Sequence, residues 1–267
     1  MKLFPIYLML FFLMACDTEK TIDYAAFYEG DKIVVHGFVN LEKGVRVFVK
    51  KTLAPDNING NDKIVNAKVY LHENGNKILS LESENDYFFV TPNSFFVDPN
   101  YKYHISVESP TLSNVYSKQQ QIPQITSIDS LKLVVKEYEP SFLKLYYNNQ
   151  SIDNGYYLKI YEYQEGIIVD SLDYSSSLFD PYNLITHKTT GVKSYKYRTS
   201  SEIDSLKVIL HTLSPDLIEF CTSYQSYDWT SEDPFYEYTY PVFSNIENGY
   251  GLFASFSFDT KTLVTEK

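Results

Sequence analysis

Residues 65–81 read VNAKVYLHENGNKILSL. Apolar residues occupy every second position from 65 to 71, with Asn66, Lys68 and Tyr70 between them, and this period of two predicts a strand with one buried face. Asn74-Gly75 follows, and Asn-Gly takes the positive φ angles of a tight hairpin turn. Residues 77–81 then supply the returning strand. The stretch therefore predicts a β-hairpin, and with it a β protein.

Similar patterns surround the hairpin. A mid-strand glycine, Gly37, interrupts an apolar run at 33–39 and indicates either a bulge or a close approach of another backbone. Short strands separated by turns predict an antiparallel sandwich. We expect it over residues 32–122, as an immunoglobulin-like or transthyretin-like domain. The other strands expected in this part of the chain lie at 45–50, 87–90, 95–97 and 101–107.

A second β segment is expected after the polar, proline-containing stretch 118–125, which marks a domain boundary. We therefore predict a C-terminal β domain over residues 123–267, in tandem with the first. Its strands are expected at 131–135, 142–147, 156–163, 167–172, 194–197, 206–212 and 251–258.

One helix is expected within this second domain, near residues 214–229. Ser214 is a favourable N-cap, Pro215 suits the first helical position, and the carboxylate of Asp216 favours the positive end of the helix dipole. Leu217, Phe220, Cys221 and Tyr224 follow at helical spacing and would form one apolar stripe. We expect this face to lie against the second sheet, with Cys221 as a small core residue.

The N-terminal residues indicate where the protein resides. Residues 1–16 read MKLFPIYLMLFFLMAC, a lysine followed by an apolar block too short to span a bilayer, as in a signal peptide over 1–15. Its end resembles a bacterial lipobox, in which Cys16 takes a lipid. Residues 16–31 would then form a lipidated tether. The alternative is an ordinary cleaved signal with an incidental cysteine.

The net charge of the chain limits the classes of partner that we expect. The formal net charge is −11, which disfavours nucleic acid because its phosphates would be repelled. Aromatic residues make up 16% of the chain, and most of them suit half-buried sheet surfaces. The lipobox predicts attachment to a membrane through a lipid on Cys16. The residues after it, Asp17-Thr18-Glu19-Lys20, resemble the signal that exports Bacteroidota lipoproteins to the cell surface, so we expect the body to face the cell exterior.

Four features together resemble a family of Bacteroidota lipoproteins called domain of unknown function 4249. They are the lipobox, the strand at 34–39, the segment Ile128-Asp129-Ser130-Leu131, and the closing block over 241–254. The resemblance implies a two-part, mostly β protein on the outer membrane. Such proteins are often encoded beside TonB-dependent receptors, the β-barrels that import scarce nutrients, so such a barrel is the protein partner implied. The resemblance implies no catalytic residues.

The segment after the expected helix is the best binding candidate. It holds the only tryptophan, Trp229, and then Phe235 and the alternating Tyr236, Tyr238 and Tyr240. Exposed aromatic side chains mark recognition surfaces for proteins or sugars. The alternative is that Trp229 and Phe235 pack the end of the helix onto the sheet.

Metal and catalytic motifs are weak in this sequence. The loop 56–62 is rich in oxygen-bearing side chains, but Ile58 stands where a calcium loop needs an oxygen, so a turn-rich loop is the simpler interpretation. The five histidines are scattered, and we expect structural roles for His36 and His104, which fall within predicted strands. No cofactor, metal or catalytic residue is expected.

The sequence therefore favours a non-enzymatic surface lipoprotein that assists a TonB-dependent receptor by binding the nutrient or the receptor. An adhesive or structural surface module is the main alternative. A hydrolase would need two carboxylates facing each other across a cleft, and a sequence does not place such a pair. The identity of a ligand does not follow from these residues.

Overall fold

The computed structural model describes residues 28–54, 57, 59–134, 142–171, 184–187, 189–199, 203–232 and 241–265. In this part of the chain the fold is mainly β, with several antiparallel sheets and one helix, as predicted. The expected signal peptide and Cys16 lie outside the described residues, and so does most of the expected tether.

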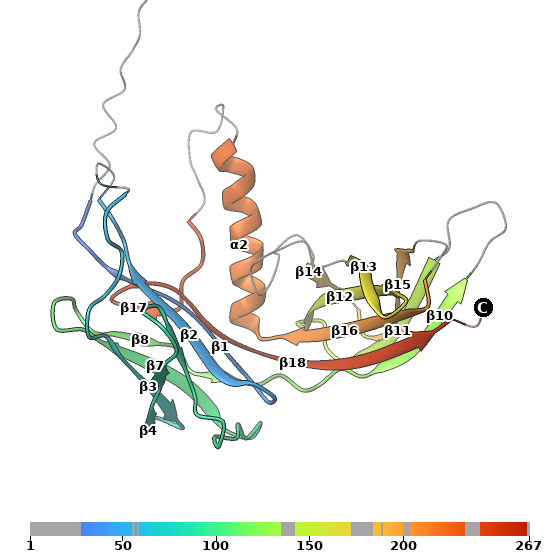
Figure 1. The fold of residues 1–267 in the computed structure, drawn as a ribbon, viewed down its shortest axis with the longest axis horizontal. Helices are drawn as coiled ribbons and strands as arrows, with labels where there is room; N and C mark the ends of the chain where they lie inside the picture. Colours follow the sequence, from blue (N-terminus) through green and yellow to red (C-terminus); the bar gives the residue numbers. More distant parts are fainter. Residues whose placement is uncertain are drawn as a thin grey trace, which may run out of the picture.

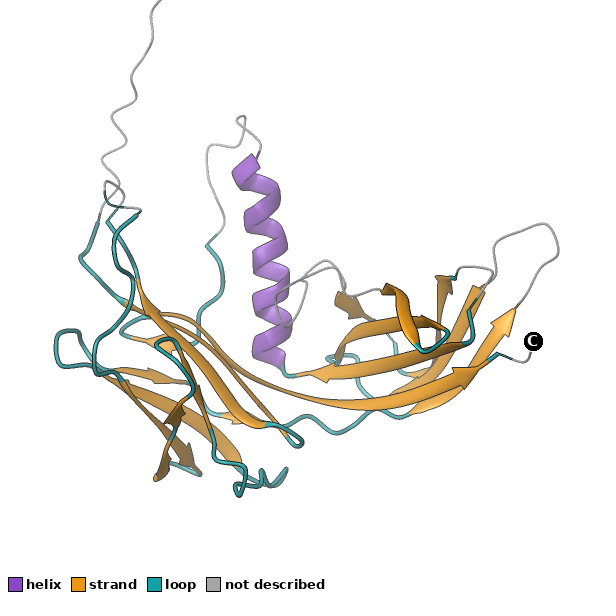
Figure 2. Ribbon diagram, viewed as in Figure 1, coloured by secondary structure: helices purple, strands orange, loops and turns teal. Residues whose placement is uncertain are grey.

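The described strands form three sheets, which Figure 1 and Figure 2 show as an elongated arrangement. The long sheet has the order β13 (Ile167–Ser171), β12 (Gly155–Gln164), β16 (Ser205–Leu213), β18 (Tyr250–Val264), β1 (Ile33–Asn40), β2 (Gly44–Lys51), β6 (Phe88–Val90) and β5 (Glu82–Ser83), with β14 (Leu184–Thr186) also paired to β12. The β7 sheet has the order β17 (Ile246–Glu247), β8 (Val115–Ser117), β7 (Lys102–Glu108), β3 (Lys68–Glu73) and β4 (Asn76–Ser80), with β9 (Gln120–Gln121) on β7. The β11 sheet has the order β10 (Ile128–Val134), β11 (Phe142–Asn149) and β15 (Gly191–Arg198).

The last strand, β18, joins the two halves of the molecule. Its first part pairs parallel with β1, from Val34↔Tyr250 to Val39↔Ser255. Its second part pairs antiparallel with β16, from Leu213↔Phe256 to Ser205↔Val264. Strand pairing therefore crosses the boundary expected at residues 122 and 123, because a strand from the C-terminal segment completes the sheet of the N-terminal segment (Figure 1).

Two cores lie between the long sheet and the smaller sheets. One is formed by β1, β2 and β6 against the β7 sheet and includes the fully buried Val35, Val47 and Leu71. The other lies between β12 and β16 on one side and the β11 sheet on the other, around Leu145, Ile160 and Leu210. Each half is thus a two-layered sandwich, and β18 belongs to the long layer of both.

The mid-strand Gly37 lies close to buried side chains, whereas its position predicted a bulge or a close approach of another backbone. It pairs with Phe253 of β18, and a Cβ at residue 37 would lie 2.8 Å from the Phe253 ring. The register of β1 is continuous on both sides, so no bulge is present there. The glycine makes room for a buried aromatic ring between the sheets.

The helix α2 (Pro215–Glu232) begins where it was expected and ends three residues beyond Trp229. The backbone N–H groups of Leu217 and Ile218 donate to the carbonyl of Ser214, which starts the helix. Leu217 and Cys221 are buried against β16 and β18, as expected. The prediction for Tyr224 is wrong, because this side chain, like Tyr227 one turn further on, is exposed. Only the first turns therefore lie on the sheet, and the rest of α2 projects away from it (Figure 2). No helix in the described residues is both long and apolar enough to cross a membrane.

Two expected strand segments differ in the structure. Residues 95–97 form part of a loop, in which the N–H of Phe95 donates to the carbonyl of Pro92 and the Phe96 side chain is exposed. Strand β3 begins at Lys68, because Asn66 has a positive φ and Val65 is exposed. In both places a turn overrides the apolar pattern.

Candidate functional site

The binding segment expected from the sequence is placed only at its start. Trp229 lies in the last turns of α2. Phe235, Tyr236, Tyr238 and Tyr240 lie outside the described residues, so the proposal that they form a binding face stays a prediction.

In the loop 56–62, which was considered as a calcium site, the carboxylate of Asp62 contacts other side chains. The Tyr87 hydroxyl donates to Asp62 Oδ1 at 2.9 Å, and Lys50 Nζ lies 3.8 Å from Asp62 Oδ2. Asp56 and Ile58 are outside the described residues. Within the described residues, no three His, Cys, Asp or Glu side chains lie close enough together to hold a metal ion.

A different surface, the outer face of the β7 sheet, gathers polar and aromatic side chains. The alternate residues of β3 and β7, including Leu71, Ile105 and Val107, are buried in the core. The strand register then aligns the outward residues in rows. One row runs Tyr70↔Ser106↔Tyr116↔Glu247 across four strands, and the next pairs His72 with His104.

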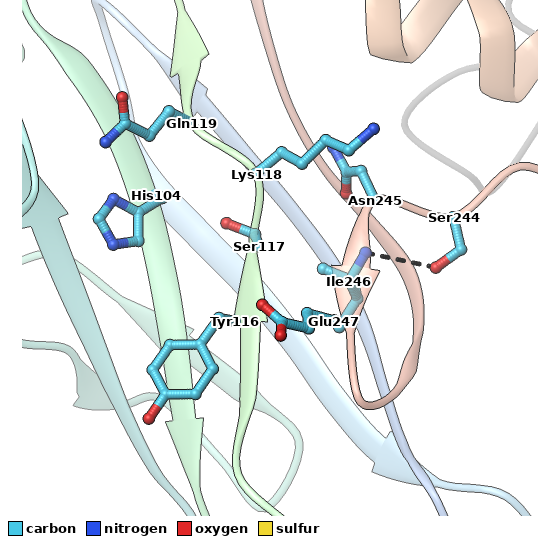
Figure 3. Close-up of a pocket in the computed structure, with 9 residues that line it drawn as sticks. All are labelled: His104, Tyr116, Ser117, Lys118, Gln119, Ser244, Asn245, Ile246 and Glu247. Carbon is cyan, nitrogen blue, oxygen red and sulfur yellow. Dashed lines mark hydrogen bonds between the residues drawn. The ribbon is translucent and has the colours of Figure 1, made fainter.

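A pocket of about 690 Å³ opens on this face (Figure 3). Figure 3 shows His104, Tyr116 and Glu247 presented from the neighbouring strands β7, β8 and β17. Its lining is formed by His104, Tyr116, Ser117, Lys118, Gln119, Ser244, Asn245, Ile246 and Glu247. The pocket offers a cation, a carboxylate, an amide and an imidazole, which suits a polar ligand held by hydrogen bonds.

Buried polar contacts fix the backbone around the pocket. The N–H of Ile105 donates to Ser117 Oγ at 2.9 Å, and the N–H of Lys118 donates to the carbonyl of Asn245 at 3.0 Å. Ser244 Oγ accepts from the N–H groups of Ile246 and Gly251 at 3.4 and 3.1 Å. One side of the pocket rim, residues 244–247, therefore belongs to the closing block that carries the family resemblance.

The two histidines of the β7 sheet form a stacked pair. Their ring centroids lie 4.3 Å apart with an interplanar angle of 18°, and His72 Nε2 lies 2.9 Å from Ser106 Oγ. His104 Nδ1 is buried and has no hydrogen-bond partner in the described part of the chain. Burial lowers the pKa of both imidazoles, and the pKa of His72 is lowered further by His104 and Lys77 and raised in part by Glu108. Both rings are therefore neutral at pH 7.

This pair predicts a specific loss of stability in acid. A histidine whose pKa is lower in the folded than in the unfolded state does not affect stability above the unfolded pKa of about 6.5. As the pH falls below that value, the unfolded chain binds protons first and the folded state is destabilised. The melting temperature of His104→Gln should therefore fall less between pH 7 and pH 5 than that of the wild type.

A change on the same face provides the control for that experiment. Tyr116→Phe removes no imidazole and should keep the wild-type dependence of melting temperature on pH. Parallel pH curves for His104→Gln and the wild type would show that the histidine pair does not contribute.

Sequence reasoning assigned His104 a structural role and did not recognise this face. A usable signal was present, because alternation in 65–71 and 101–107 already placed Val69, Leu71, Ile105 and Val107 in the core. The residues between them then had to face outward. Their alignment with Tyr116 and Glu247 could not be predicted from the sequence, because it depends on the pairing of β7, β8 and β17, and β17 lies more than a hundred residues after β8.

Comparisons with known proteins identify the family. The search of curated proteins found no match. One family model, described as Domain of unknown function (DUF4249), matches residues 17–262, which include the pocket and the three sheets except for the last two residues of β18. Since the match covers nearly the whole chain, the protein belongs to the DUF4249 family.

Proposed function

We propose that the protein is a Bacteroidota outer-membrane lipoprotein, displayed on the cell surface, that assists a TonB-dependent nutrient receptor by binding the nutrient or the receptor. It would catalyse no reaction itself. The observation that carries this proposal is the lipobox ending at Cys16, directly before the family match that starts at residue 17. Lipidation there would tether a folded body to the membrane.

The pocket on the β7 sheet supports a binding role. Lys118 and Glu247 are exposed side chains of opposite charge, and Tyr116 is 43% exposed beside them. These groups come from two chain segments, 116–118 and 245–247, whose backbones are joined by a hydrogen bond from Lys118 N–H to the Asn245 carbonyl, so little ordering is needed when a ligand binds. A preformed polar pocket of this kind favours recognition of a ligand or a loop of a partner protein.

An adhesive or spacer module is the second candidate. The observation that favours it is the elongated shape, in which the single strand β18 connects both halves (Figure 1). A spacer does not need a polar pocket, so variants of the pocket distinguish the two functions.

Lipidation is tested first. In cells fed an alkyne-bearing fatty acid, the wild type should carry the label and Cys16→Ala should not, because the thiol is the expected acceptor. An unmodified mature N-terminus in mass spectrometry of the wild type would contradict the membrane anchor.

The partnership is tested by purification in mild detergent. The wild type should co-purify with an outer-membrane barrel, and Lys118→Ala/Glu247→Ala should recover less of it. The matched control is Lys43→Ala/Glu42→Ala, which removes the same two charges in the exposed turn between β1 and β2, away from the β7 sheet. A clean, barrel-free monomer from the wild type would count against the proposal, and equal recovery by all variants would show that the pocket is not the contact.

A further inference from the structure

The β11 sheet carries three lysines in one row. Strand pairing places Lys132 of β10 opposite Lys144 of β11, and Lys144 opposite Lys196 of β15. Residues paired directly on neighbouring strands point to the same face of a sheet. The three ammonium groups therefore form a ladder across the whole width of this sheet, which we call the lysine ladder.

The lysine ladder lies on the outer face of the sheet. The residues between its members, such as Leu133, Leu143 and Tyr197, contribute to the core on the inner face. Lys132 and Lys196 are exposed, and Lys144 on the central strand is partly exposed. Two residues further along, Arg198 pairs with Phe142 on the same outer face, which adds a fourth cation.

Positive charge on this face is not balanced by acidic groups among the described residues. There, none of the ion pairs involves Lys132, Lys144, Lys196 or Arg198. The three strands contain five basic residues and one acidic residue, Asp129, in a chain whose net charge is −11. Asp129 lies where the β10 register shifts between Ile128 and Ser130. The ladder is thus a local concentration of positive charge on an acidic protein.

A role in stabilising the fold does not explain why three lysines lie in one row. Like charges directly opposite each other on neighbouring strands destabilise a sheet. Lysines on edge strands protect against edge-to-edge association, which accounts for Lys132 and Lys196 on β10 and β15. Lys144 lies on the central strand, where no edge needs protection, and there it faces a like charge on both sides.

We propose that the lysine ladder is a binding site for an acidic polysaccharide, whose carboxylate or sulfate groups pair with the three ammonium groups. The site lies on a different sheet from the pocket and does not depend on a receptor, so it goes beyond the function proposed above.

Spacing and chemistry favour a glycan over other polyanions. Neighbouring strands lie about 4.8 Å apart, so the ladder offers one cation per repeat of roughly one sugar ring. A nucleic-acid duplex carries one phosphate charge per about 1.7 Å of helix axis, a denser charge than the ladder provides. Tyr146 lies two residues from Lys144 on the same face, where its half-buried ring can contact the apolar face of a sugar.

The site must act at short range. At physiological salt the electrostatic screening length is about 8 Å. A ligand in contact with the ladder is therefore attracted by the three lysines, while repulsion from more distant acidic residues is screened. The β11 sheet also lies at the opposite end of the molecule from the first described segment of the chain, which is coloured blue in Figure 1. That position favours a partner in solution over the membrane that anchors the N-terminus.

Binding can be measured with the full chain in mild detergent, using polygalacturonate and dextran sulfate as acidic probes. Both should bind at 50 mM salt, and at least ten-fold more weakly at 300 mM, because the contacts are ionic. Uncharged dextran should not bind. Single-stranded DNA and micelles containing anionic phospholipid should bind at least ten-fold more weakly than the better polysaccharide.

The decisive variant is Lys132→Gln/Lys144→Gln/Lys196→Gln, which should bind the acidic probes at least ten-fold more weakly at 50 mM salt. The matched control, Lys43→Gln/Lys68→Gln/Lys102→Gln, makes the same change in net charge at three exposed lysines outside the β11 sheet and should lose less than two-fold. The ladder variant should also melt at the same or a higher temperature than the wild type, since repulsion along the row is removed.

Three results would overturn the proposal. Equal losses in the ladder and control variants would mean that overall charge, and not this site, controls binding. Equal binding of dextran would mean that ionic contacts are not used. Tighter binding of DNA or of anionic micelles than of either polysaccharide would assign the ladder to a different class of partner.

Discussion

Gly251→Ala is expected to destabilise the protein by about 3 kcal/mol or more. Gly251 has a φ of +113°, and a Cβ at this position would lie 1.9 Å from the carbonyl oxygen of Val35. Val35 is its partner in the parallel pairing of β1 and β18. Because the clash is with backbone, it cannot be relieved by moving a side chain, and the two strands must separate locally.

The measurement is thermal unfolding followed by far-ultraviolet circular dichroism. For a chain of this size, the expected loss corresponds to a melting temperature lower by about 10 °C. The variant should also be more susceptible to proteolysis, since β18 holds both halves together.

Gly191→Ala is the matched control for this prediction. Gly191 has a similar φ of +99°, but a Cβ there would meet nothing within 4 Å. It should cost only about 1 kcal/mol, the strain of a side chain at positive φ. Equal losses at residues 191 and 251 would mean that the close approach to Val35 does not matter.

Local pattern predicted most of the strands. Alternation placed Val45, Val47 and Val49 on one buried face of β2, and the Asn74-Gly75 pair gave the turn between β3 and β4. These signals work because a strand with one buried face must repeat every two residues. Capping residues located the start of α2 for a similar reason, since their effect is confined to one turn.

Long-range pairing was not predictable in the same way. Nothing in the local sequence around Tyr250 indicates that β18 pairs with β1, which lies more than two hundred residues earlier. Similarly, the lysine ladder depends on registers that join 132 to 144 and 144 to 196. Such alignments follow from the three-dimensional fit of the two cores, and one-dimensional periodicity does not contain them.

The residues of the closing block, 241–254, have roles in holding the fold together. Within this block the N–H of Gly251 donates a hydrogen bond to the Ser244 hydroxyl, which fixes the backbone where the chain enters β18. Its asparagine, Asn245, bonds the backbone of Phe253 and the helix start. These contacts account for polar residues and glycines at fixed positions without a catalytic role.

Asn245→Asp is therefore expected to have a second large effect, about 3 kcal/mol of lost stability. Asn245 is 3% exposed, and its Nδ2 donates to Asp216 Oδ2 at 2.6 Å and to the Phe253 carbonyl at 2.7 Å. Aspartate keeps the shape and can still accept from the N–H of Phe253, as Oδ1 does now at 2.8 Å. It loses both donated hydrogen bonds and places two carboxylates in contact.

The pH dependence identifies the cause. Two neighbouring carboxylates raise the pKa of one of them in the folded state, and a carboxyl group with a raised pKa favours folding at low pH and opposes it as the pH rises. The stability lost by Asn245→Asp should therefore be larger at pH 8 than at pH 5, as measured by denaturant unfolding at both values. A cavity or a packing defect would give the same loss at both.

A second change should restore part of the stability. In Asn245→Asp/Asp216→Asn the donor and the acceptor exchange places, so one hydrogen bond returns and the repulsion is removed. The Phe253 carbonyl still lacks its donor, and Gln120 Nε2, which donates to Asp216 Oδ2 at 2.7 Å, loses its charged acceptor. About half of the lost free energy should be recovered, and Asn93→Asp, at an exposed position in a turn, should change stability by no more than about 0.5 kcal/mol. If the double variant is no more stable than Asn245→Asp, the contact with Asp216 is not what holds the first turn of α2 to the start of β18.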